Sequence, residues 1–292
     1  MSVLKSTFKW LAILISLSVV ILGSTIFIAY QSLPSVDNIN GCFTTTMFEV
    51  ELCPTSGNYV KYSQLPKYLV GALIASEDSS FFFHKGFDWD EIEDSLQKSM
   101  DAGRWVRGGS TLTQQLAKNL YLNQDRTITR KVKEFYLADR IEKKLSKAQI
   151  IEKYFNVVGF GEKIYGIKKA ANYYFAKSPS QLTPAECAYL VSLLPSPVKY
   201  SRTFRNQKDL SPFNKKRTQR ILTLLRMQGK VSEQEFEHES ARIDQGLWKP
   251  LSEIPTQEDS SSYSDVYFRE KALPENYPTV EDLPPAEEEP AD

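Results

Sequence analysis

The sequence predicts a mostly α-helical domain that follows a single membrane-spanning helix. The first observation is an uncharged, apolar run of 20 residues over 11–30. A helix rises about 1.5 Å per residue, so this run spans about 30 Å, the hydrocarbon thickness of a bilayer. The second is that apolar residues recur with helical spacing over 65–228, between capping residues. The third is that the sequence contains no series of alternating strands and no internal repeat.

The charges around the apolar run predict its orientation. Lys5 and Lys9 precede it, and the next basic residue is Lys61. The positive-inside rule therefore keeps residues 1–10 in the cytoplasm and exports the rest of the chain. A cleaved signal peptide is the alternative. The length of the run and the lack of a clear small-x-small cleavage site favour an uncleaved anchor over 11–30.

The exported part divides into a connector over 31–58 with a short extended piece, a helical domain over 59–248 and a tail over 249–292. The tail is rich in proline, serine and acids, and after Lys271 it has no base. It cannot bury enough apolar surface to offset its ordering entropy, so we expect disorder. It would serve for solubility or for binding a partner. The helices expected in the domain cover 65–76, 89–102, 111–122, 127–145, 147–155 and 215–228.

Composition limits the classes of function. The 292 residues allow one good-sized domain with appendages. Lysines plus arginines equal aspartates plus glutamates at 36 each, which indicates no nucleic-acid partner. A local basic stretch over 126–147 suits a phosphate-bearing small ligand. Two histidines exclude a histidine-rich zinc site. Cys42 and Cys53 either form a disulfide in an oxidising compartment or remain reduced, and Cys187 has the surroundings of a core residue.

The most informative run is RGGSTLTQQLAKN over 107–119. Gly108 and Gly109 allow a tight turn and a close approach of the backbone to a ligand. Ser110 is a candidate N-cap for the helix that follows, whose free N–H groups suit an anion. The leucines of this helix face a core, which leaves a polar set for an anionic, hydroxyl-rich ligand: Gln114, Gln115, Lys118 and Asn119.

Five ordered segments resemble the peptidoglycan glycosyltransferases of glycosyltransferase family 51, which polymerise lipid II. EDSSFFFHKGFD over 77–88 is similar to the family's E-D-x-x-F-x-x-H-x-G-x-D, and 108–119 matches G-G-S-T-x-T-Q-Q-x-x-K-N in full. RKVKE over 130–134 matches R-K-x-x-E, and 147–156 ends in the similar IIEKYFN. The segment 166–197 resembles the A-A-x-x-Y-F and L-P-x-x-P elements. Five such motifs in order are not expected by chance.

The resemblance implies a lysozyme-like helical fold. The sequence departs from the family after the fifth segment, where LPSPVKYS lacks the expected Tyr-Asn-Pro ending, in a loop away from the motif glutamates. Nothing after the helical domain resembles the S-x-x-K and K-T-G elements of a transpeptidase. The chain therefore resembles a monofunctional transglycosylase.

Glu77 is the candidate catalytic base. It ends an apolar helix and precedes three phenylalanines, a setting that can raise the pKa of a carboxylate for this task. The alternative is a surface glutamate at a helix C-terminus, where the helix dipole disfavours its charge. That misfit and the motif together favour catalysis.

Glu134 is the second candidate catalytic residue. By spacing alone, one turn after Arg130, it is an ordinary helical ion pair. The resemblance implies an anionic carboxylate that positions basic groups around a pyrophosphate or helps to hold Mg²⁺ or Mn²⁺. No cofactor is required by the sequence itself.

The remaining site candidates follow from the need for positive charge and hydrogen bonds at a diphosphate-sugar. The candidate cations are Lys118, Arg126, Arg130 and Lys133, and the candidate hydrogen-bonding residues are Ser110, Gln114, Gln115 and, more weakly, Tyr174. Lys131, Lys143 and Lys144 are assigned to solvated helix faces, and His84 to support of the loop that carries Glu77.

The resemblance thus implies an anchored enzyme that joins lipid II units by inverting β-1,4 transfer and releases undecaprenyl pyrophosphate. Its expected partners are lipid II, the nascent glycan strand, the bacterial inner membrane and other cell-wall synthesis proteins. The catalytic domain would lie on the periplasmic or extracellular side. A glycan-cleaving lysozyme-like enzyme and a non-catalytic cell-wall scaffold are the alternatives. The basic cluster disfavours cleavage, which has no diphosphate to neutralise.

Overall fold

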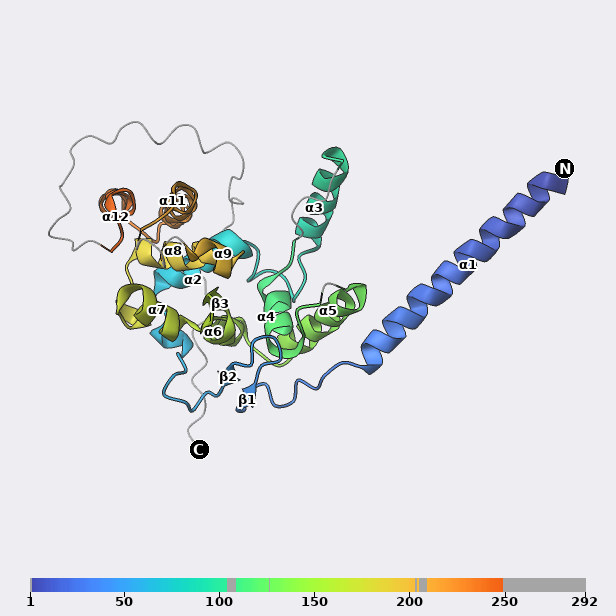
Figure 1. Cartoon of the computed structure of the whole chain (residues 1–292), viewed down its shortest axis with the longest axis horizontal. Coiled ribbons are helices and arrows are strands. Elements are labelled where there is room, and N and C mark those ends of the chain that lie inside the picture. Colours follow the sequence, from blue (N-terminus) through green and yellow to red (C-terminus); the bar gives the residue numbers. More distant parts are fainter. Residues whose placement is uncertain (1, 104–108, 126, 203, 205–208, 249–292) are drawn as a thin grey trace.

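The computed structural model describes residues 2–103, 109–125, 127–202, 204 and 209–248. The expected mostly helical fold is confirmed (Figure 1). The strands are β1 Phe43–Thr44, β2 Glu51–Leu52, β3 Gly159–Gly161 and β4 Ile164–Tyr165, paired as two antiparallel hairpins. The helices are α1 Ser2–Gln31, η1 Tyr62–Gln64, α2 Lys67–Glu77, α3 Trp89–Asp101, α4 Leu112–Tyr121, α5 Ile128–Glu142, α6 Lys147–Val157, α7 Ile167–Phe175, η2 Pro179–Gln181, α8 Pro184–Leu193, α9 Pro197–Tyr200, α11 Pro212–Met227 and α12 Glu233–Gln245.

Helix α1 projects away from the rest of the chain (Figure 1). Its span Lys9–Ile28 has a mean hydropathy of 2.6 and no buried part, so by length and composition it is able to cross a membrane. Its end contacts α5. The ring centroids of Tyr30 and Tyr136 are 5.5 Å apart, and the guanidinium of Arg140 lies 5.7 Å from the Tyr30 ring. The candidate anchor is thereby joined to the helix that carries Glu134.

Helix α8 forms the centre of the domain, and all of its residues are buried. Its sequence PAECAYLVSL is apolar on every side, which is typical of a helix surrounded by others. It packs against α2, α11 and α12. A capping box of Thr183 and Glu186 begins it, with Pro184 at the first helical position.

A buried ionic cluster joins α12 to α8. Arg242 contacts Glu239 on its own helix at 3.0 Å and Glu186 on α8 at 3.3 Å. Lys177 donates to the same Glu186 carboxylate at 2.7 Å. Two cations therefore balance two carboxylates that are almost without solvent contact, as buried charges require.

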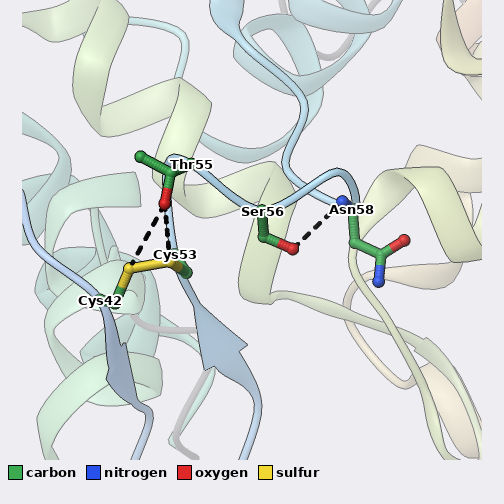
Figure 2. The surroundings of a disulfide bond; sticks show 5 residues. All are labelled: Cys42, Cys53, Thr55, Ser56 and Asn58. Atoms are coloured by element: carbon green, nitrogen blue, oxygen red, sulfur yellow. Dashed lines mark hydrogen bonds between the residues drawn. A yellow bond between two sulfur atoms is a disulfide. The ribbon is translucent and has the colours of Figure 1, made fainter.

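The connector forms the β1–β2 hairpin, which Cys42 and Cys53 close as a disulfide (Figure 2). The Thr55 hydroxyl lies 3.3 Å from Sγ of Cys53. The hairpin holds the end of α4, because the N–H of Thr46 donates to the carbonyl of Leu120 at 2.9 Å. The connector is thus attached to a helix of the candidate site.

The helices begin and end close to the expected positions, whereas the β3–β4 hairpin is a feature that the pattern analysis did not find. Its strands have three and two residues, too few to show an alternation of apolar and polar residues. Lys163 turns the chain between them with φ of +58°. The tail over 249–292 and its expected disorder lie outside the described residues.

Removal of the disulfide should destabilise the domain. Replacement of Cys42 and Cys53 by serine frees a loop with a sequence separation of 11, which costs roughly 3 kcal/mol of unfolding free energy. We expect the melting temperature to fall by about 6–12 °C. Thermal unfolding in detergent checks this, and reductant should lower the melting temperature of the wild type only. A wild type indifferent to reductant would contradict the expectation.

Candidate functional site

Glu77 is the last residue of α2, and it follows the part of this helix that is buried in the core. The helix buries six consecutive residues, Leu69 to Ile74, against the core. Glu77 is partly exposed and interacts with its surroundings. Asp78 follows with non-helical backbone angles, φ of −158° and ψ of 80°, so its side chain points differently from those of the helix.

The Asp78 carboxylate joins three parts of the chain. Its side chain is 3% exposed. Oδ1 accepts from Nε2 of His84 at 3.0 Å, and Oδ2 accepts from the backbone N–H of Leu112 at 2.8 Å. Nδ1 of His84 accepts from the N–H of Gly86 at 3.1 Å, so the imidazole carries its proton on Nε2. His84 therefore supports the loop that carries Glu77, as expected.

A second contact fixes the same loop to the start of α4. The hydroxyl of Thr111 donates to the carbonyl of Gly86 at 2.7 Å. Gly86 has φ of +89°, and a Cβ there would lie 3.3 Å from Cγ of Glu142. Only glycine adopts this conformation without strain, so the family-like glycine at this position has a structural reason.

Thr111, and not Ser110, caps α4, so this expectation was wrong. Thr111 has extended backbone angles, and its Oγ1 accepts from the N–H of Gln114. Ser110 instead accepts at Oγ from Nζ of Lys131 at 2.8 Å. Its hydroxyl therefore faces the basic helix α5.

The glycine before Ser110 brings α3 close to this loop. A Cβ at Gly109 would lie 2.6 Å from Cγ of Glu91 and 3.3 Å from its carbonyl oxygen. The close approach expected of this glycine is therefore made to α3. Arg107 and Gly108 lie outside the described residues.

The two glutamines of α4 have different surroundings. Gln114 is 4% exposed, and its Oε1 accepts from the N–H of Thr111 to complete a capping box. Gln115 is less buried and accepts from the hydroxyl of Tyr154 at 2.9 Å. Burial, and then the charge of Glu77, raises the pKa of Tyr154. Gln115 and Tyr154 therefore lie within the electrostatic reach of Glu77.

Glu134 is buried on α5 between two cations. One carboxylate oxygen forms an ion pair with Arg130, and the other accepts from Lys131 at 2.7 Å. Lys131 is exposed, as its assignment to a solvated face predicts, but its ammonium also donates to Ser110, a contact that this assignment did not include. The three-residue spacing of Lys131 and Glu134 on a helix was the signal for this contact.

The ammonium groups beside Glu134 are held in a partly desolvated setting. Burial, and then the charges of Arg130 and Lys118, lowers the pKa of Lys131 to about 8, while the Glu134 carboxylate favours the charged form. Burial, and then Arg130, lowers the pKa of Lys118. Two cations therefore contact the Glu134 carboxylate and Lys118 acts on both of them, which leaves an excess of positive charge for an anionic ligand.

Three other described candidates, Lys133, Tyr174 and Asn119, do not join this group. Among the described residues Lys133 makes no hydrogen bond or ion pair, and Arg126 lies outside them. Tyr174 is 3% exposed and donates to the carbonyl of Phe160 at 2.8 Å, so it is a core residue. Asn119 is also buried, at 5% exposure, and not available on the surface.

Glu134 does not fit a metal site. Both of its oxygens contact cations of the chain. Within the described ranges no group of three or more His, Cys, Asp or Glu side chains is placed to hold a metal ion. The residues present therefore favour neutralisation of an anion by the side chains themselves.

The fourth motif stabilises the wall of the domain. Glu152 accepts from the Tyr59 hydroxyl and from the N–H of Tyr62, both at 2.6 Å. Asn156 pairs with both backbone groups of Val60. These contacts fasten the segment before α2 onto α6. The sequence motif contains Glu152 and Asn156, but a motif match alone does not distinguish this structural role from a catalytic one.

The comparisons with known proteins agree with this geometry. Three curated relatives are each called biosynthetic peptidoglycan transglycosylase. Those from Alcanivorax borkumensis, Azoarcus sp. and Nitrosospira multiformis are 49%, 46% and 39% identical over 48%, 50% and 56% of this chain. The chain spans 57%, 63% and 69% of their respective lengths. The transglycosylase family model matches residues 45–227, more than half of the chain and every described residue of the site. The chain belongs to the transglycosylase family.

Proposed function

We propose that this chain is a membrane-anchored glycosyltransferase that polymerises lipid II into β-1,4-linked glycan strands. The supporting observation is that contacts of neighbouring residues connect two different carboxylates to the first turns of one helix, α4. Glu77 reaches α4 through Asp78 and through Tyr154 and Gln115. Glu134 reaches it through Lys131 and Ser110. The charge of Glu77 acts on Tyr154, whereas Glu134 is neutralised by the two cations that contact it.

This division suits sugar transfer from a diphosphate. Glu77 takes the proton of the 4-hydroxyl of the acceptor sugar, and that oxygen attacks C1 of the donor from the face opposite the leaving group. The C1–O bond breaks with inversion, and undecaprenyl pyrophosphate leaves with the bonding electrons. Lys118, Arg130 and Lys131 stabilise the charge that develops on the diphosphate. Glu134 holds two of these cations in place, which is a positioning role.

The rival activity is glycan cleavage. A hydrolase of lysozyme type needs a protonated glutamate and a second carboxylate, and has no diphosphate to stabilise. Glu134, held by Arg130 and Lys131, is poorly suited to act as its nucleophile. The cation cluster therefore favours synthesis.

The location proposed is the outer side of the cytoplasmic membrane, with α1 as the anchor. The disulfide of Cys42 and Cys53 supports an oxidising compartment for the domain. Exposed apolar side chains on α3, among them Trp89, Leu96 and Met100, support contact of this helix with the lipid surface.

Replacement of Glu77 by glutamine should abolish polymerisation, because the amide cannot accept the proton. We expect the rate of glycan formation from labelled lipid II, followed on a gel, to fall by about 100-fold or more. Glu51→Gln, an exposed glutamate on β2, is the matched control and should retain the wild-type rate. Equal ladders from wild type and Glu77→Gln would remove Glu77 as the base. Digestion of preformed strands by the wild type would favour the hydrolase.

The alkaline limit of activity should depend on Lys131. Its ammonium is charged below its pKa of about 8, so the wild-type rate should fall as the pH rises above this value. Lys131→Arg keeps its charge at higher pH, so its decline should begin at least one pH unit later. Polymerisation rates from pH 6 to pH 10 check this. Lys143→Arg, an exposed lysine paired with Asp139 at 2.7 Å, is the control. Identical alkaline limbs in wild type and Lys131→Arg would contradict the role of this ammonium.

A further inference from the structure

An exposed surface that combines aromatic rings with basic groups lies on α9 and the first turns of α11. The guanidinium of Arg217 is 5.3 Å from the ring centroid of Tyr200 and 5.9 Å from that of Phe213. Phe213 is 53% exposed. We call this surface the aromatic–basic patch, and it comprises Lys199, Tyr200, Arg202, Phe213, Lys216 and Arg217.

The two helices of the patch carry basic side chains, and the exposed Asp209 precedes α11. Neither α9 nor α11 contains an acidic residue. Asp244 belongs to the neighbouring helix α12 and accepts from Gln219 at 3.3 Å. Lys199, Arg202 and Lys216 are exposed on the surface. The patch therefore suits a ligand that carries several carboxylates, which arginine binds with two parallel hydrogen bonds.

The chain carries a suitable anion itself. Residues 272–292 contain seven acidic residues and no base. The last described residue before this part of the sequence, Trp248, donates from Nε1 to the carbonyl of Tyr174 at 2.7 Å. Its ring lies 4.8 Å from the ring of Phe204, two residues after Arg202 of the patch. The chain therefore leaves the domain beside the patch.

The distance between this exit and the acidic sequence is short enough for contact. The 23 residues from 249 to 271 have a root-mean-square reach of about 25 Å when treated as a coil. A tether of this length gives an effective concentration on the order of millimolar, so weak ion pairs suffice for binding. We propose that residues 272–292 bind the aromatic–basic patch of the same chain. Tyr277 and Leu283 supply apolar side chains for its rings.

Carbodiimide cross-linking of the full-length protein in detergent tests this proposal, because the reagent joins amines to carboxylates that are in contact. At low salt we expect Lys199 and Lys216 to link to Glu287, Glu288 or Glu289. The yield should be at least about five times that for Lys85, an exposed lysine of the Glu77 loop. About 0.5 M NaCl should abolish the difference, because it screens exposed ion pairs.

Charge reversal supplies the matched variants. Lys199→Glu with Lys216→Glu should remove the link, as should Glu287→Lys with Glu288→Lys and Glu289→Lys. The combination of both sets should restore it with the roles of amine and carboxylate exchanged. A mixture of isotopically labelled and unlabelled chains distinguishes contact within one chain from contact between two. Links only between chains, or equal yields at Lys85 and the patch, would overturn the proposal.

Discussion

The buried carboxylate of Asp78 is the interaction on which the arrangement of the site depends. It accepts hydrogen bonds from the imidazole of His84 and from the first free N–H of α4. A helix N-terminus favours an anion, and a buried donor without a partner costs about 1–3 kcal/mol. Separation of the loop after α2 from the start of α4 would leave these buried polar groups without hydrogen-bond partners. This energetic cost holds the two segments together. Glu77 precedes Asp78 directly, so this contact also sets the direction of Glu77.

Helix α4 connects the parts of the candidate site, because its two ends and its faces contact different elements. Its capping box starts the helix, Gln115 faces Tyr154, and Lys118 lies near the cations of α5. At its far end Leu120 accepts from the disulfide-closed hairpin. Glu134 is neutralised by Arg130 and Lys131, so the group as a whole keeps a positive charge in a partly desolvated place. Charge in such a place acts more strongly on a ligand than it does in water.

The sequence allowed α1 to α6 and α11 to be predicted, because these helices depend on local spacing, and the roles of Glu77 and Glu134 stay predictions. The capping boxes at Ser146 and Thr183 likewise follow from local spacing, with Gln149 and Glu186 three residues later. The contacts that the sequence did not predict join segments that are distant in the sequence. Ser110 and Thr111 are both suitable caps by composition, and only the bonds to Asp78 and Gly86 place the helix start after Thr111. Lys131 is exposed as assigned, and only its contact with Ser110, which comes from another segment, was not predicted. Tyr174 is an aromatic of the core, as the default for its type indicates.

The most direct test of the account is polymerisation of lipid II by Asp78→Ala, measured at a temperature where circular dichroism shows a folded protein. Alanine leaves the N–H of Leu112 and the imidazole of His84 without their acceptor, while Glu77 itself is unchanged. The account predicts a rate lower by about 100-fold with lipid II binding largely retained, because the base is present but misdirected. A folded Asp78→Ala that polymerises at the wild-type rate would contradict it.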